Sequence, residues 1–121
     1  MIAGIDHVQL AAPPGCEEEA RRFFGGVLGL EELPKPGEIA ARGGVWFRCG
    51  PQQLHVGVED AFAPARKAHP GFAVDGGERL DALAARLAAA GATVAWNDDI
   101  AGSARFHAED PWGNRLEFRA V

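Results

Sequence analysis

The stretch NRLEFRAV, from Asn114 to Val121, places a glutamate in the middle of an apolar strand pattern. Side chains alternate between the two faces of a strand, so Leu116 and Phe118 share one face and Glu117 lies on the other. A carboxylate is costly to bury without a partner. The pattern therefore indicates that the second face is polar and carries groups that bind Glu117.

The composition is that of one small globular domain. The chain has 121 residues, of which 47% are hydrophobic and 24% charged, enough for a single core. It has no apolar run of about 18 residues, and its start lacks the zones of a signal peptide, so we expect a cytoplasmic protein. A net charge of −5 without a basic stripe argues against a nucleic-acid or membrane partner. Cys16 and Cys49 lack metal or redox spacing, and we expect reduced thiols.

Two similar series of elements follow one another along the chain. The first is a strand at 5–11, a helix at 16–30 that stops at Gly29, and strands at 32–36, 45–50 and 52–59. The second is a strand at 69–76, a helix at 78–91, and strands at 93–99, 103–110 and 114–121. We interpret the turn DPWGN at 110–114 as structural. The sequence thus predicts an α+β fold of two βαβββ modules, 1–59 and 69–121, joined by a linker at 60–68.

One offset relates the residues that carry chemistry. Three pairs lie 62 residues apart: the helix-ending glycines Gly29 and Gly91, His7 with His69, and His55 with Glu117. Each first-strand histidine therefore has a counterpart in the other module, and Glu117 occupies the place that His55 holds in the first.

Strand alternation puts these residues on equivalent faces. His7 shares a face with Gln9, whereas Val8 and Leu10 lie on the opposite face. The apolar faces can be covered by the two helices, which leaves the opposite faces as one concave polar surface. The four residues expected on it are His7, His55, His69 and Glu117. Three imidazoles and a carboxylate suit a divalent transition metal such as zinc, iron, nickel, cobalt or manganese.

Other polar residues on these faces have more than one interpretation. We expect five to line a substrate cavity: Gln9, Trp46, Arg48, Arg115 and Arg119. Trp46 could equally be ordinary packing, and Glu117 could instead form an ion pair with Arg115, Arg119 or Arg48. The fourth histidine, His107, has Val45 as its counterpart at the offset, and we interpret it as a cavity or surface residue.

The sequence resembles the vicinal oxygen chelate superfamily, which includes glyoxalase I, fosfomycin-resistance enzymes, extradiol dioxygenases and bleomycin-resistance proteins. The resemblance rests on the element order, His7 in IDHVQLA, His69 in HPGFAVD, the helix end FFGGVLGL, and Glu117 in EDPWGNRLEF. It implies a cup-shaped, partly open mixed sheet with helices on its outer face. The implied metal ligands are His7, His55, His69 and Glu117. Glyoxalase I has a glutamate where this chain has His55.

The same resemblance implies a metal-dependent lyase, isomerase, transferase or dioxygenase. Its substrate would be a small molecule that chelates the metal through adjacent oxygens. His55, if not a ligand, could act as a general base, so His55 and Glu117 are the candidate catalytic residues. One alternative is a metal-free drug-binding protein of the bleomycin-resistance kind, and another is a relative in which the polar residues form only an ion-pair network. The family also implies a homodimer.

Overall fold

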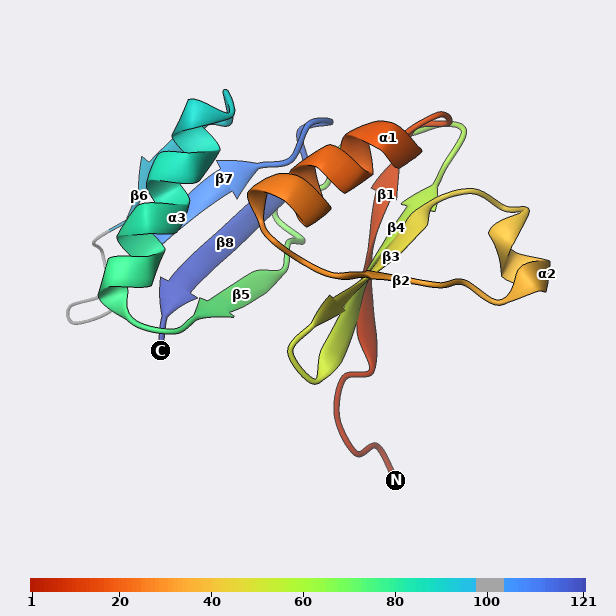
Figure 1. Ribbon diagram of the computed structural model, residues 1–121, viewed down its shortest axis with the longest axis horizontal. Coiled ribbons are helices and arrows are strands. Elements are labelled where there is room, and N and C mark those ends of the chain that lie inside the picture. Colours follow the sequence, from red (N-terminus) through yellow and green to blue (C-terminus); the bar gives the residue numbers. More distant parts are fainter. Residues whose placement is uncertain (98–103) are drawn as a thin grey trace. The chain divides into compact units, whose positions relative to one another are not determined.

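Each half of the chain forms one four-stranded mixed sheet in the computed structural model, which describes residues 1–97 and 104–121 (Figure 1). The chain divides into two compact units, Met1–Ala63 and Pro64–Val121. The ends of two expected strands, namely Asp98, Asp99 and Ser103, lie outside the described residues. No helix in the described ranges is long and apolar enough to cross a membrane.

The first unit has a parallel edge strand in an otherwise antiparallel sheet. Its elements are β1 (His7–Ala12), α1 (Glu17–Ala20), the π-helix η1 (Arg21–Val27), β2 (Glu32–Leu33), α2 (Gly37–Ala40), β3 (Val45–Cys49) and β4 (Gln52–Val58). The strand order is β1-β4-β3-β2, with β1 parallel to β4. A parallel neighbour requires a crossover, and the α1–η1 segment begins that connection.

The second unit repeats this topology. Its elements are β5 (Gly71–Val74), α3 (Gly77–Ala89), β6 (Val94–Trp96), β7 (Arg105–Glu109) and β8 (Arg115–Ala120), with strand order β5-β8-β7-β6. Strand β5 is parallel to β8, and the remaining pairs are antiparallel. The predicted α+β fold of two βαβββ modules with open mixed sheets is confirmed.

The apolar faces pack as the alternation predicts. In the first unit Phe24 of η1 packs against Phe47 of β3, with ring centroids 5.8 Å apart. In the second unit α3 contacts the sheet through its buried Leu80, Ala84 and Leu87, and Figure 1 shows this helix lying along the sheet. Phe106 and Phe118 stack on the covered face at 5.1 Å. Each unit therefore has a core of its own between helix and sheet.

Several local expectations differ from the structure, and the strand expected at 32–36 is only the two-residue β2. The segment after Ala20 is a π-helix, in which Leu28 N–H donates to Phe23 O five residues back, where the sequence predicts an α-helix. Gly25 and Gly26 lie inside it, and glycine has little preference for the α-helical backbone. Helix α2 occupies a segment where no element is expected. Val8, expected in the core, is 37% exposed because it lies near the start of an edge strand.

Gly44 is required by a close backbone approach. Its φ is +85°, and a Cβ atom there would lie 2.2 Å from the carbonyl oxygen of Val56. Its own N–H donates to Glu17 Oε2 at 2.8 Å, which ties the segment before β3 to the start of α1. A side chain at this position would have to displace backbone.

We predict that Gly44→Ala destabilises the protein far more than Gly15→Ala. Gly15 has a similar φ of +83° but open space around it. Its substitution therefore costs only the strain of a positive φ in a residue with a Cβ, about 1–2 kcal/mol of stability. Gly44→Ala adds a steric clash, and we expect a loss of about 3 kcal/mol or more. Chemical denaturation of both variants measures the difference, and equal losses would contradict the steric argument.

Candidate metal centre

Strand register brings Glu117 into a row of polar groups on the second sheet. Glu117 of β8 lies directly opposite His107 of β7 and opposite Gly71 of β5. Gly71 has no side chain, and a Cβ atom there would be 4.0 Å from Glu117 Oε2. The carboxylate therefore lies between a histidine on one neighbouring strand and a glycine, which has no side chain, on the other.

Two imidazoles and a guanidinium contact the Glu117 carboxylate. Its Oε1 lies 3.4 Å from His69 Nε2 and 3.1 Å from His107 Nε2. Its Oε2 lies 3.7 Å from Arg105 Nη1, and the Glu117 side chain is only 15% exposed. Burial raises the pKa of Glu117, but the hydrogen bond with His69, the charge of Arg105 and the contact with His107 outweigh it. The net pKa is below the ordinary value, so Glu117 is an anion at neutral pH.

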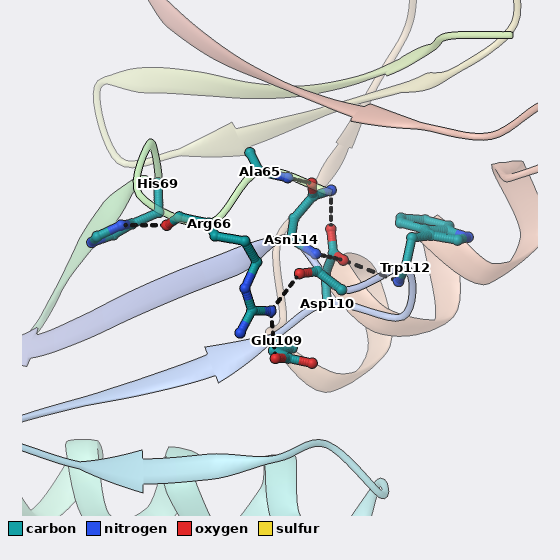
Figure 2. A network of polar contacts seen from close by, with 8 residues as sticks. Ala65, Arg66, His69, Glu109, Asp110, Trp112 and Asn114 are labelled. Carbon is teal, nitrogen blue, oxygen red and sulfur yellow. Dashed lines mark hydrogen bonds and ion pairs between the residues drawn. The ribbon is translucent and has the colours of Figure 1, made fainter. Parts of the chain in front are cut away.

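The backbone selects which nitrogen of His69 faces Glu117. His69 Nδ1 lies 3.1 Å from the carbonyl oxygen of Arg66 and 3.0 Å from that of Lys67; Figure 2 shows the contact with Arg66. Carbonyl oxygens only accept, so Nδ1 carries the proton and Nε2 of the neutral ring has a lone pair. The hydrogen bond between Nε2 and Glu117 Oε1, 3.4 Å apart, therefore requires a second proton on the ring. Their contact calls for a cation between or on them, either a proton or a metal ion.

The donor set fits a divalent transition metal. In the described part of the chain, His69, His107 and Glu117 are the one group of three such residues whose donor atoms all lie within 4.8 Å of one another. Metal-binding histidines commonly donate their second ring N–H to a carbonyl or carboxylate, as His69 does. Two imidazoles and a carboxylate match the preferences of zinc, nickel or ferrous iron.

The polar face of the first sheet carries a stack of rings. His55 of β4 lies between His7 and Trp46, with centroid distances of 4.3 Å and 4.0 Å. His55 is 5% exposed, and its Nε2 lies 2.8 Å from Gln53 Oε1. Burial lowers the pKa of His55, and the neighbouring His7 lowers it further, so the ring is neutral at pH 7. His7 Nδ1 donates to Asp6 Oδ2 at 2.9 Å, which leaves the lone pair of the neutral ring on Nε2.

The four expected ligands therefore fall into two pairs. His7 and His55 stack on the first sheet, and His69 and Glu117 are in contact on the second. His69 precedes β5 rather than beginning it, since Pro70 has no N–H to contribute to a strand ladder. The structure describes each unit by itself, so the predicted four-residue set stays a prediction.

The expected cavity residues have varied surroundings. The amide of Gln9 lies beside Gly57, and Trp46 stacks on His55. Arg48 forms an ion pair with Glu31 at 3.1 Å. Arg115 lies opposite Glu109, and Arg119 lies opposite Arg105. The arginine in contact with Glu117 is Arg105, which the sequence did not single out. Among the described residues, its Nε is the one buried side-chain nitrogen or oxygen without a hydrogen bond.

His107 is the site residue that the offset set aside. His55 lies opposite Trp46, nine residues earlier, whereas Glu117 lies opposite His107, ten residues earlier. The hairpin between β7 and β8 is thus one residue longer than that between β3 and β4. The offset of 62 residues therefore pairs each β3 residue with a β7 residue on the opposite face of the sheet. The counterpart of His107 is Trp46, not Val45. Alternation in the strand itself, with Phe106 and Ala108 facing the core, would have found it.

The comparisons with known proteins agree with the topology. The sequence model of the Glyoxalase/Bleomycin resistance protein/Dioxygenase superfamily matches residues 4–118. A solved structure of a glyoxalase-family protein from Bacillus anthracis is 49% identical, covers 99% of this chain and 96% of its own, and has a TM-score of 0.92. A comparison with functionally curated proteins finds no match. The chain therefore belongs to the Glyoxalase/Bleomycin resistance protein/Dioxygenase superfamily.

Two more distant structures share the fold. Lactoylglutathione lyase from Agrobacterium tumefaciens is 23% identical with a TM-score of 0.77, covering 98% of this chain and 94% of its own. The fosfomycin resistance protein FosX from Listeria monocytogenes is 17% identical with a TM-score of 0.81, covering 100% and 95%. At these identities the likeness concerns the fold alone. Members of this superfamily bind small-molecule substrates.

We predict that Glu117→Gln lowers the stability of metal-free protein at neutral pH but not at low pH. A lowered pKa means that the anion stabilises the fold above the ordinary value of about 4.3 and that this contribution is lost as pH falls through the lower native value. We expect the parent to be about 1–3 kcal/mol more stable at pH 7. Denaturation in the presence of a chelator between about pH 3 and pH 7 measures the gap. A gap independent of pH would contradict the assignment.

Proposed function

We propose that this chain is a metal-dependent enzyme of the glyoxalase type acting on a small substrate with two adjacent oxygens. The observation that carries the proposal is the His69–Glu117 pair. It is an anion with 15% of its side chain exposed, 3.4 Å from Nε2 of an imidazole whose Nδ1 donates to backbone carbonyls. In the neutral ring, Nε2 has only a lone pair, so its contact with the Glu117 carboxylate is unfavourable unless a proton or a metal ion lies between them. A histidine whose other nitrogen donates to a carbonyl is the usual form of a metal ligand.

We propose that His7 and His55 supply the remaining ligands, from the same chain or from a second copy. His7 offers Nε2, because Asp6 accepts from Nδ1. His55 offers Nδ1, because Gln53 Oε1 accepts from Nε2. The low pKa of His55, caused first by burial, keeps the ring neutral and able to bind a metal or accept a proton.

A bound divalent ion would supply Lewis acidity toward the adjacent oxygens of the substrate. The other roles fall to the protein. Glu117 and His69 would hold the ion, and Arg105 places a positive charge beside them that would favour an anionic substrate. His107, 3.1 Å from Glu117 Oε1, is placed either to bind the ion or to carry a proton. Lyase, isomerase, transferase and dioxygenase reactions all use such a site.

A metal-free drug-binding protein is the second candidate. The Trp46–His55–His7 ring stack favours it, because stacked rings suit a flat aromatic ligand. In that case His69 and Glu117 would meet through a proton rather than a metal ion. We further propose a cytoplasmic homodimer, which light scattering and cell fractionation would test.

The purified protein should bind about one divalent transition metal per chain. Because bound imidazoles must be neutral, we expect the metal to be lost as pH falls from about 6.5 to 5. Calorimetric titration with zinc, nickel, manganese and ferrous iron measures binding. Loaded protein is then assayed for formation of lactoylglutathione, modification of fosfomycin and ring cleavage of a catechol. Affinities weaker than micromolar for every metal, together with tight bleomycin binding, would favour the second candidate.

Alanine variants should rank the ligands. We expect His7→Ala, His69→Ala and Glu117→Ala each to weaken metal binding at least about tenfold, or about 1.4 kcal/mol. His55→Ala should lose less metal affinity but more turnover if the ring also moves a proton.

The His107→Ala variant distinguishes the two roles proposed for His107. If His107 is a ligand, the variant binds metal more weakly; if it carries a proton, the variant keeps its metal affinity and only kcat falls. Thermal melts of all five variants serve as the control. A Glu117→Ala variant that binds metal like the parent would make the carboxylate a structural ion-pair partner.

A further inference from the structure

The turn between β7 and β8 is held by two buried polar side chains. Asp110 is 5% exposed and Asn114 is 1% exposed. Asp110 Oδ1 accepts from the N–H groups of Asn114 and Trp112 at 2.8 Å and 3.0 Å, and its Oδ2 accepts from Asn114 Nδ2 at 2.7 Å (Figure 2). The carboxylate thereby fixes the orientation of the Asn114 amide, with its oxygen directed away from the turn.

That amide oxygen binds the segment that leads to His69. Asn114 Oδ1 accepts from the N–H of Ala65 at 2.9 Å, and the N–H of Arg115 donates to Ala65 O at 2.9 Å. Arg66 Nη1 donates to Gly113 O at 2.9 Å and to Glu109 Oε1 at 2.5 Å. Pro64 also lies against the turn, 3.4 Å from where a Cβ of Gly113 would be. Ala65 and Arg66 are thus attached to the hairpin at several points.

His69 lies between this attachment and a second one. On its far side the N–H of Glu117 donates to Pro70 O at 3.0 Å. Between the two anchors the chain bends so that the carbonyl oxygens of Arg66 and Lys67 both face His69 Nδ1. The orientation of the ring therefore depends on where Arg66 lies, and the hairpin turn sets that position (Figure 2).

We propose that Asp110 and Asn114 are positioning residues that set the tautomer and direction of the His69 ring. With the turn intact, the Arg66 and Lys67 carbonyls keep a proton on Nδ1, and Nε2 is the nitrogen that faces Glu117. The Arg66 side chain holds the same segment against the hairpin, through its hydrogen bonds to Gly113 O and Glu109 Oε1. The inference rests on the proposed function in that a bound metal uses Nε2, but the tautomer itself is a property of the metal-free protein.

The experiment compares Asn114→Ala with a core variant, Leu87→Ala. Leu87 is fully buried in α3 and lies outside the turn network, so its loss lowers stability without touching His69. Imidazole ¹⁵N spectra of the metal-free proteins are recorded at about pH 8, where an ordinary histidine is neutral. We expect His69 to be Nδ1–H in the parent and in Leu87→Ala, and a mixture of tautomers in Asn114→Ala. His7 should be unchanged in all three.

Metal titrations below the melting temperature form the second readout. We expect Asn114→Ala to weaken metal binding about tenfold, the usual effect of losing an outer contact to a ligand, and Leu87→Ala to remain within about twofold of the parent. If Asn114→Ala does not fold, Arg66→Ala replaces it. Its matched control is Arg79→Ala, another exposed arginine of the same unit, ion-paired with Asp75.

The outcomes separate the two proposals. A variant that melts lower but keeps the Nδ1–H tautomer and the parent's metal affinity would overturn the positioning role and make the turn purely structural. A shifted tautomer in a protein that binds no metal in any form would support the positioning role and overturn the proposed function. A shifted tautomer with weakened metal binding supports both.

Discussion

The alternation of side chains along β8 is the constraint on which the second unit depends. Leu116 and Phe118 must face α3, so Glu117 must face away, and it does so in the middle of a sheet rather than at its rim. A carboxylate there keeps its charge only if the neighbouring strands supply partners. His107 across the ladder and Arg105 two residues before it provide them. The apolar core face of β8 and the polar cluster around Glu117 thus both follow from the alternation of side chains along this strand.

The same period explains what could be predicted from the sequence. Apolar alternation and helix-ending glycines gave the two modules, their strand order along the chain and the position of Glu117 on the face opposite Leu116 and Phe118. These features depend on residues one or two positions apart, where geometry is fixed by the backbone. The helical hydrogen-bond pattern was different. The segment after Ala20 widens to a π-helix around Gly25 and Gly26, and helical periodicity of apolar residues does not distinguish this hydrogen-bond pattern from an α-helix.

The site was predicted less completely, because its contacts cross hairpins. A hairpin one residue longer in the second module moves His107 to the polar face, and a fixed repeat offset cannot register that change. Arg105 escaped notice for a related reason. It reaches Glu117 diagonally across the hairpin, from two residues before His107, so this contact also depends on the strand register. Which nitrogen of His69 faces Glu117 depends on where the Arg66 and Lys67 carbonyls lie, and a sequence does not record those positions.

The two modules have the same topology but use their polar faces differently. The first sheet carries stacked rings and amides, with a histidine kept neutral by burial. The second carries a half-buried anion, Glu117, in contact with Arg105, His69 and His107. Such an anion is stable only while positive charge remains close, so the second face is suited to holding a cation. The first face is suited to presenting neutral donors and flat surfaces. The repeated fold therefore presents different chemistry on equivalent faces of its two sheets without a change in the type of core.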